Sequence, residues 1–292
     1  MARLPYSEVA GKLITFLSSD RLLLNGFLTE RHGSRDCMIY VHGMGGNFYS
    51  GILSKAIAQG ALKAGYSTFA INTRGHDLES SAKVLSGRNG RRLPIGTKLE
   101  RFEDCARDIG GAIAAMRKLG YRRFALAGHS TGCQKVLYYL LKTTDRSVRT
   151  LVLLAPDDDY NLNRKKLGRR CLATVSLAKK MMADGRRNSQ VPGTGFSAQR
   201  FLSIADLKRP EARLFNYDGE LAEFGRIRAP VFVAFGTRDE GAVKPVSAYV
   251  RILKEHSGSR KFGYLLIRRA THSFTGYEKR LAAGVSSWLR TM

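Results

Sequence analysis

The sequence Gly128-His129-Ser130-Thr131-Gly132 places a serine between two glycines, each two positions away. In a G-x-S-x-G sequence the serine occupies a sharp turn between a buried strand and a helix, and the turn holds its hydroxyl clear of the backbone. Such a hydroxyl attacks a carbonyl carbon once a neighbouring base accepts its proton. Ser130 is therefore the candidate nucleophile. The apolar run at 124–127 and the helical spacing of apolar residues at 136–141 predict the strand and the helix that the turn requires.

Histidine is the base whose ordinary pKa suits this task near neutral pH. Of the six histidines, His272 alone follows the last predicted strand and precedes the last predicted helix. An imidazole also needs an acid on its other nitrogen, which fixes its tautomer and orientation. Asp239 follows a strand and precedes His272, whereas the run at 157–159 is a rival acid after a different strand. Chain order favours Asp239 and leaves the rival run open.

These residues belong to a chain in which short apolar runs alternate with helical patterns. Strands are predicted at 12–18, 22–29, 38–41, 67–71, 124–127, 150–155, 231–235 and 262–267. Helices are predicted at 53–64, 99–119, 136–141, 172–182, 198–207 and 246–255, with a last helix through Trp288. The polar stretch 78–98 is predicted to be a surface loop. This alternation predicts an α/β fold with a mainly parallel sheet and helices on both faces, whose ligands lie at the carboxyl ends of the strands.

The alternation stops between residues 157 and 227, where basic residues, large apolar residues and helical patterns follow one another. We expect this segment to be an inserted, mostly helical cap. Residues 1–156 and 228–292 are expected to form the core.

The net charge of +25 is unusual for a chain with these motifs. Lysine and arginine are spread as pairs along the sequence, without a block of five or six like charges. We therefore expect no specific nucleic-acid partner, although attraction to anionic substrates or surfaces stays open. The four cysteines have no C-x-x-C spacing, so we expect no metal site and no disulfide framework. No window holds 18 consecutive apolar residues and the amino terminus lacks a signal-like apolar run, which favours a cytoplasmic protein without a membrane span.

Five ordered motifs together resemble the α/β-hydrolase superfamily. They are His42-Gly43-Met44-Gly45-Gly46, Arg74-Gly75-His76, Gly128 to Gly132, Gly236-Thr237-Arg238-Asp239 and Thr271-His272-Ser273-Phe274. The resemblance implies an α/β-hydrolase fold, a catalytic triad and an oxyanion hole formed by the backbone N–H groups of Met44 and Thr131. It also implies that segment 157–227 covers the site, and it implies no cofactor. The strings 128–134 and 271–276 have a weaker resemblance to the branch that includes fungal siderophore esterases.

The resulting hypothesis is a serine hydrolase of the carboxylesterase type. In it Ser130 attacks an ester, His272 moves the proton, and Asp239 holds the imidazole. An acyltransferase or thioesterase with the same three residues is an alternative, as is a non-catalytic binding protein on a hydrolase scaffold. The sequence does not specify the acyl group, the alcohol or the oligomeric state.

Overall fold

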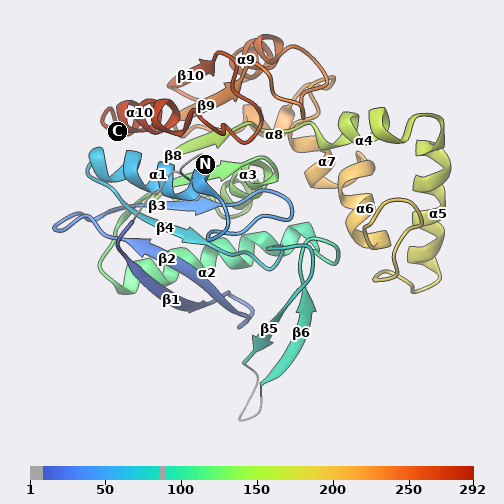
Figure 1. Ribbon diagram of the computed structural model, residues 1–292. Helices are drawn as coiled ribbons and strands as arrows, with labels where there is room; N and C mark the ends of the chain where they lie inside the picture. The colour runs from blue at the N-terminus through green and yellow to red at the C-terminus, as the bar shows by residue number, and fades with distance from the viewer. Residues whose placement is uncertain (1–8, 86–89) are drawn as a thin grey trace, which may run out of the picture.

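A single eight-stranded sheet forms the centre of the molecule (Figure 1). The computed structural model describes residues 9–85 and 90–292. In spatial order the strands are β1 (Lys12–Leu17), β2 (Leu23–Thr29), β4 (Ser67–Ile71), β3 (Asp36–Val41), β7 (Arg123–His129), β8 (Val148–Leu154), β9 (Val231–Gly236) and β10 (Phe262–Ile267). All neighbours from β4 to β10 pair in parallel, whereas β1–β2 and β2–β4 pair antiparallel. The central strands are buried almost throughout, as expected where helices cover both faces.

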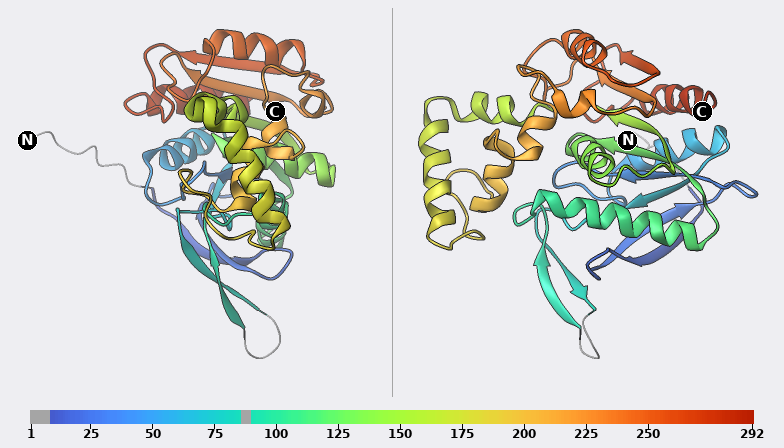
Figure 2. Two further views of the ribbon diagram at one scale, coloured as in Figure 1. Left: turned by 90° about the vertical axis from the view of Figure 1, so that its right-hand side faces the viewer. Right: turned by 180° about the vertical axis from the view of Figure 1, so that it is seen from behind.

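The two faces of the sheet are covered by different helices (Figures 1 and 2). On one face α1 (Ile52–Lys63) packs along α10 (Glu278–Leu289), and on the other α2 (Cys105–Lys118) packs along α3 (Thr131–Thr143). Gly60 permits the first contact, because a Cβ at this position would lie 2.6 Å from the carbonyl oxygen of Ala282. Helix α9 (Val246–Glu255) connects β9 to β10. In the described part of the chain, no helix has the length and apolar character needed to cross a membrane.

The prediction of a surface loop over 78–98 is wrong. Strands β5 (Ser80–Val84) and β6 (Arg91–Ile95) form an antiparallel hairpin that projects from the body of the protein (Figure 1). Most of its side chains are exposed or only half-buried. The stretch is rich in arginine and glycine and lacks the apolar alternation typical of a strand. A strand that buries so few side chains does not need that alternation. The helix predicted from 99 starts later, as a short turn at Phe102–Asp104 that leads into α2.

Segment 157–227 contains helices and no strand within the described residues. Its helices are α4 (Asp159–Leu167), α5 (Cys171–Ala183), α6 (Ala198–Ala205), α7 (Pro210–Leu214) and α8 (Ala222–Gly225). Helices α5 and α6 share a small apolar cluster, around Phe201 and Met181, that is separate from the main core. Figure 1 shows α4 to α7 together at one side of the sheet. The sequence patterns predicted α5 and α6 but did not reveal α4 or the short helices α7 and α8.

A buried cluster of charges joins this helical segment to the sheet's helices. Arg200 of α6 forms a two-pronged ion pair with Glu211 of α7, and its second nitrogen lies 2.9 Å from Glu211 Oε1. Lys135 of α3 lies 2.6 Å from Glu100, whose other oxygen is 4.0 Å from Arg200. All four residues are at most 3% exposed. Two opposite pairs in contact give a cluster without net charge, which limits the cost of removing these groups from water.

We predict that Arg200→Met lowers the free energy of unfolding by about 3–5 kcal/mol, because it leaves the Glu211 carboxylate buried without its partner. The exposed pair of Arg186 and Asp184 provides the control, since Arg186→Met should change stability by less than about 1 kcal/mol. Urea denaturation of the three proteins measures both values. Equal losses in the two variants would contradict a structural role for the buried cluster.

Candidate active site

Ser130 has the strained backbone that the G-x-S-x-G turn demands. Its φ of 54° and ψ of −128° lie outside the ordinary regions for a residue with a side chain, a conformation that costs about 1–3 kcal/mol. A Cβ on Gly128 would lie 2.3 Å from the carbonyl oxygen of Gly132, and one on Gly132 would lie 2.3 Å from that of Val41. Both glycines are therefore required sterically. The turn places the Ser130 side chain at the carboxyl end of β7 and the start of α3.

His272 and Asp239 meet at the same edge of the sheet, in the loops that follow β10 and β9. Nδ1 of His272 lies 2.9 Å from Oδ1 of Asp239. The backbone N–H of Gly241 donates to the same carboxylate oxygen at 2.9 Å, and the N–H of His272 donates to Glu240 at 3.0 Å. The imidazole is thus fixed through Nδ1, and Nε2 faces Asp157 at 3.5 Å.

The Ser130 hydroxyl donates to Asp157, and not to the predicted base. Its Oγ lies 3.1 Å from Oδ2 of Asp157, and the same carboxylate oxygen is 3.5 Å from Nε2 of His272. Asp157 belongs to the rival acidic run, but it does not replace Asp239. It lies on the opposite side of the imidazole, next to the serine. No sequence signal separated its place from that of Asp158 or Asp159, because the three residues are adjacent and identical in type.

The carboxylates shift the pKa of the imidazole. Burial by itself lowers the pKa of His272, but the hydrogen bond with Asp239 and the negative charges of Asp157 and Asp239 outweigh burial and raise it to about 9. Burial raises the pKa of Asp157 to about 6, against the opposing charge of His272. The site therefore favours an imidazolium beside a carboxylate over two neutral groups.

The loop after β3 passes directly beside the serine. A Cβ on Gly43 would lie 2.9 Å from Cβ of Ser130. In the described part of the chain, the backbone N–H groups of Met44 and Thr131 donate to no protein acceptor. Backbone N–H groups without a protein acceptor can stabilise an oxyanion when a carbonyl oxygen lies against them.

Two further histidines hold these loops in place. His42 is buried, contacts the carbonyl oxygen of Gly43 through Nδ1 at 2.8 Å and accepts from the N–H of Thr73 at 3.2 Å. Nε2 of His129 lies 3.0 Å from the carbonyl oxygen of His272. Burial lowers the pKa of His42 to about 3 and that of His129 to about 4, so both rings are neutral at pH 7.

Asp157, Asp239 and His272 are also the described residues whose ligand atoms lie close enough together to hold a metal ion, all within 4.8 Å. The hydrogen bond between His272 and Asp239 already uses one ring nitrogen and one carboxylate oxygen. A cation here would have to displace the proton that these two groups share.

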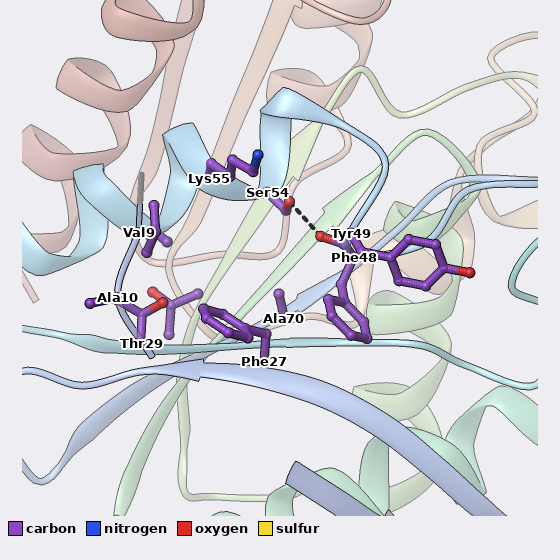
Figure 3. Close-up of a pocket in the computed structure, with 11 residues that line it drawn as sticks. Val9, Ala10, Phe27, Thr29, Phe48, Tyr49, Ser54, Lys55 and Ala70 are labelled. Carbon is purple, nitrogen blue, oxygen red and sulfur yellow. Dashed lines mark hydrogen bonds between the residues drawn. The ribbon is translucent and has the colours of Figure 1, made fainter. Parts of the chain in front are cut away.

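An apolar cavity of about 510 Å³ lies between α1 and the strands β2 and β4 (Figure 3). Figure 3 shows Phe27 and Ala70 on the sheet side and Ser54 and Lys55 on α1. Phe48, whose carbonyl oxygen accepts from Ser54 at 2.8 Å, belongs to the same loop as Met44. Ser130, Asp239 and His272 do not line this cavity.

Comparison with known proteins relates this geometry to a family. The sequence profile of the family described as "alpha/beta hydrolase fold" matches residues 36–216. No curated protein matches the chain significantly by sequence. Among solved structures, the chain is similar to Est1E from Butyrivibrio proteoclasticus with bound ferulic acid, at 15% identity and a TM-score of 0.62, covering 94% of this chain and 98% of that one.

Two lipases have the same fold. A soluble variant of monoglyceride lipase from Saccharomyces cerevisiae, in complex with a substrate analogue, is 14% identical with a TM-score of 0.67 and covers 99% of both chains. A monoacylglycerol lipase from Paleococcus ferrophilus is 19% identical with a TM-score of 0.59, covering 97% of this chain and 99% of that one. At identities of 14–19%, these similarities show the fold of this chain alone.

We predict that the imidazole of His272 titrates with a midpoint well above 6.5. Asp239→Asn should lower this midpoint, because an amide lacks the negative charge that stabilises the imidazolium. The raised pKa means that the imidazolium stabilises the folded state below pH ~6.5, and that this contribution is lost as the pH rises through about 9. Histidine NMR titration measures the midpoint. Asp184→Asn, an exposed carboxylate in the helical segment, is the control and should leave it unchanged. An identical midpoint in wild type and Asp239→Asn would contradict the assignment.

Proposed function

The chain belongs to the α/β-hydrolase family, and from that premise we propose that it is a serine esterase of the carboxylesterase type. The observation that carries the proposal is a serine in a strained turn, at the same sheet edge as a histidine that an aspartate holds through Nδ1. The esterase and lipases of the same fold support a small-molecule ester as the substrate. The triad would be Ser130, His272 and Asp239.

In the proposed reaction, Ser130 Oγ attacks the ester carbonyl carbon while Nε2 of His272 accepts its proton. Asp239 keeps the imidazole in the required tautomer and stabilises the imidazolium that forms. The N–H groups of Met44 and Thr131 would bind the oxyanion, and the loss of one such donor typically costs about 2.7–4 kcal/mol of transition-state stabilisation. The imidazolium then protonates the departing alcohol, and the acyl group remains on Ser130.

The raised pKa of His272 has a consequence for this sequence. A base must be unprotonated to accept the serine proton, so the first step requires pH values near or above the pKa of about 9, unless substrate binding lowers it. The close carboxylate of Asp157 contributes to the raised value. A neutral substrate that separates Asp157 from the imidazole would lower the pKa of His272, because it weakens the effect of the negative charge. Protonation of Asp157 on substrate binding would have the same effect.

We propose that segment 157–227 is the cap of this enzyme and shapes the substrate pocket. It leaves the sheet at the end of β8, and its helix α4 begins two residues after Asp157, which contacts the nucleophile. The buried contact of Arg200 with Glu100 fixes the segment to the core close to α3, the helix that begins at the nucleophile. A segment anchored in this way would limit which acyl groups can enter the site.

Ser130→Ala should abolish hydrolysis of p-nitrophenyl esters, because it removes the hydroxyl oxygen that is proposed to attack the ester carbonyl. Ser197 offers a matched control: it too is a buried serine preceding a helix, where its hydroxyl accepts from the N–H of Arg200 at 3.2 Å. Ser197→Ala should cost about 1 kcal/mol of stability and keep ester turnover. Initial rates measured from p-nitrophenolate release decide the matter. Undiminished turnover by Ser130→Ala would refute the proposed function.

A further inference from the structure

Asp157 is a carboxylate that the proposed triad does not use, although it touches both the nucleophile and the base. The Ser130 hydroxyl donates to Oδ2 at 3.1 Å, and the same oxygen lies 3.5 Å from Nε2 of His272. Asp157 is 9% exposed, and no lysine or arginine forms an ion pair with it among the described residues. Besides the His272 imidazole, the donor that this buried carboxylate contacts is the serine hydroxyl.

The position of Asp157 is fixed from several directions. Its backbone carbonyl accepts from the side-chain amide of Gln134 on α3 at 3.0 Å. The preceding carbonyl, of Pro156, accepts from the hydroxyl of Tyr217 at 3.0 Å. The carboxylate lies against Gly241, where a Cβ would be 2.9 Å from Oδ1. The group is thus held beside the reacting atoms.

Acylation of Ser130 removes the hydroxyl that donates to Asp157. An ester oxygen carries no hydrogen, so Oδ2 loses its hydrogen bond while the carboxylate stays buried. Once His272 has given its proton to the departing alcohol, its neutral Nε2 and Oδ2 of Asp157 are two acceptor atoms 3.5 Å apart, so one donor can lie against both. That position is also where a nucleophile must lie if His272 is to activate it for attack on the acyl group.

We infer that Asp157 and His272 together bind the water molecule that hydrolyses the acyl-enzyme, each accepting one of its two hydrogens. The inference rests on the proposed function and adds to it a residue that selects water as the acyl acceptor. With both hydrogens held, a lone pair of the water oxygen is directed at the acyl carbonyl carbon.

The step balances without any other reactant. The water oxygen bonds to the acyl carbon as Nε2 takes one proton, and the carbonyl oxygen becomes the oxyanion. The bond from carbon to Ser130 Oγ then breaks, the imidazolium returns its proton to Oγ, and the carboxylic acid leaves with the second hydrogen of the water. The restored hydroxyl again donates to Asp157, which accepts hydrogen bonds throughout and never takes the proton.

Selection among acceptors follows from the number of hydrogens. An alcohol has a single O–H, and His272 must accept that hydrogen to activate the alcohol. The buried carboxylate of Asp157 would then face the alkyl group of the alcohol and lack a hydrogen bond. Water satisfies both acceptors. The wild-type enzyme should therefore favour hydrolysis over transfer to an alcohol, and loss of the Asp157 carboxylate should reduce that preference.

The test compares wild type with Asp157→Leu and Asp157→Asn in stopped-flow reactions with p-nitrophenyl butyrate. Leucine has a similar shape and no hydrogen-bond acceptor. Asp157→Leu should therefore release one equivalent of p-nitrophenolate rapidly and then turn over about 10- to 100-fold more slowly than wild type. This factor is the effect of losing one hydrogen bond to a charged group. Intact mass spectrometry should detect the butyryl adduct. Asp157→Asn keeps a carbonyl acceptor and should lie between the two.

A second readout is the product ratio in the presence of methanol. The ratio of methyl butyrate to butyric acid should rise in Asp157→Leu relative to wild type, which a merely structural defect would not produce. Asp218→Asn is the control, an exposed carboxylate that pairs with Lys244 and should change neither the burst nor the ratio. Thermal unfolding and the rate of fluorophosphonate labelling confirm that each variant is folded with a reactive Ser130.

Unchanged deacylation and an unchanged product ratio in folded Asp157→Leu would overturn the inference. If that variant does not fold, the same two readouts on Asp157→Asn decide it. Failure of the proposed function looks different: wild type would not be labelled by fluorophosphonate and Ser130→Ala would keep its activity, and the inference would then fall with it.

Discussion

The left-handed backbone of Ser130, enforced by the close contact of Gly132 with the carbonyl oxygen of Val41, is the constraint on which the site depends. Strand β3, strand β7 and helix α3 can approach this closely only where a side chain is missing. The strain is offset by the large buried core around the sheet, which over-determines the conformation. Every other group of the site is positioned relative to this turn, in the loops that follow neighbouring parallel strands.

The site is rich in negative charge, whereas the whole chain has a large positive net charge. A chain with a net charge of +25 gathers Asp157, Asp239 and Glu240 around one imidazole. Their proximity raises the pKa of His272, while the buried Lys135, Glu100, Arg200 and Glu211 balance one another a short distance along α3. Local charge pairing, and not the net charge, therefore sets the protonation states on which the proposed chemistry depends.

The core of the fold could be predicted because its strands are short apolar runs ended by glycine-rich loops, as at 38–46 and 124–132. The β5–β6 hairpin could not, since it buries few side chains and carries no apolar alternation. Motif spacing predicted that Ser130, Asp239 and His272 share an edge, because parallel strands end there. The contact of Asp157 with Ser130 depends on the path of the chain after Pro156, which no periodicity encodes.

In the proposed function, the hydrogen-bonded pair of His272 and Asp239 activates the Ser130 hydroxyl. Reaction of the wild-type chain with a fluorophosphonate, followed by peptide mass spectrometry, tests it most directly. We expect one phosphonyl group per chain, located on Ser130, with ester turnover lost in proportion to labelling. Labelling of a different residue, or full turnover by a chain that takes up no label, would contradict it.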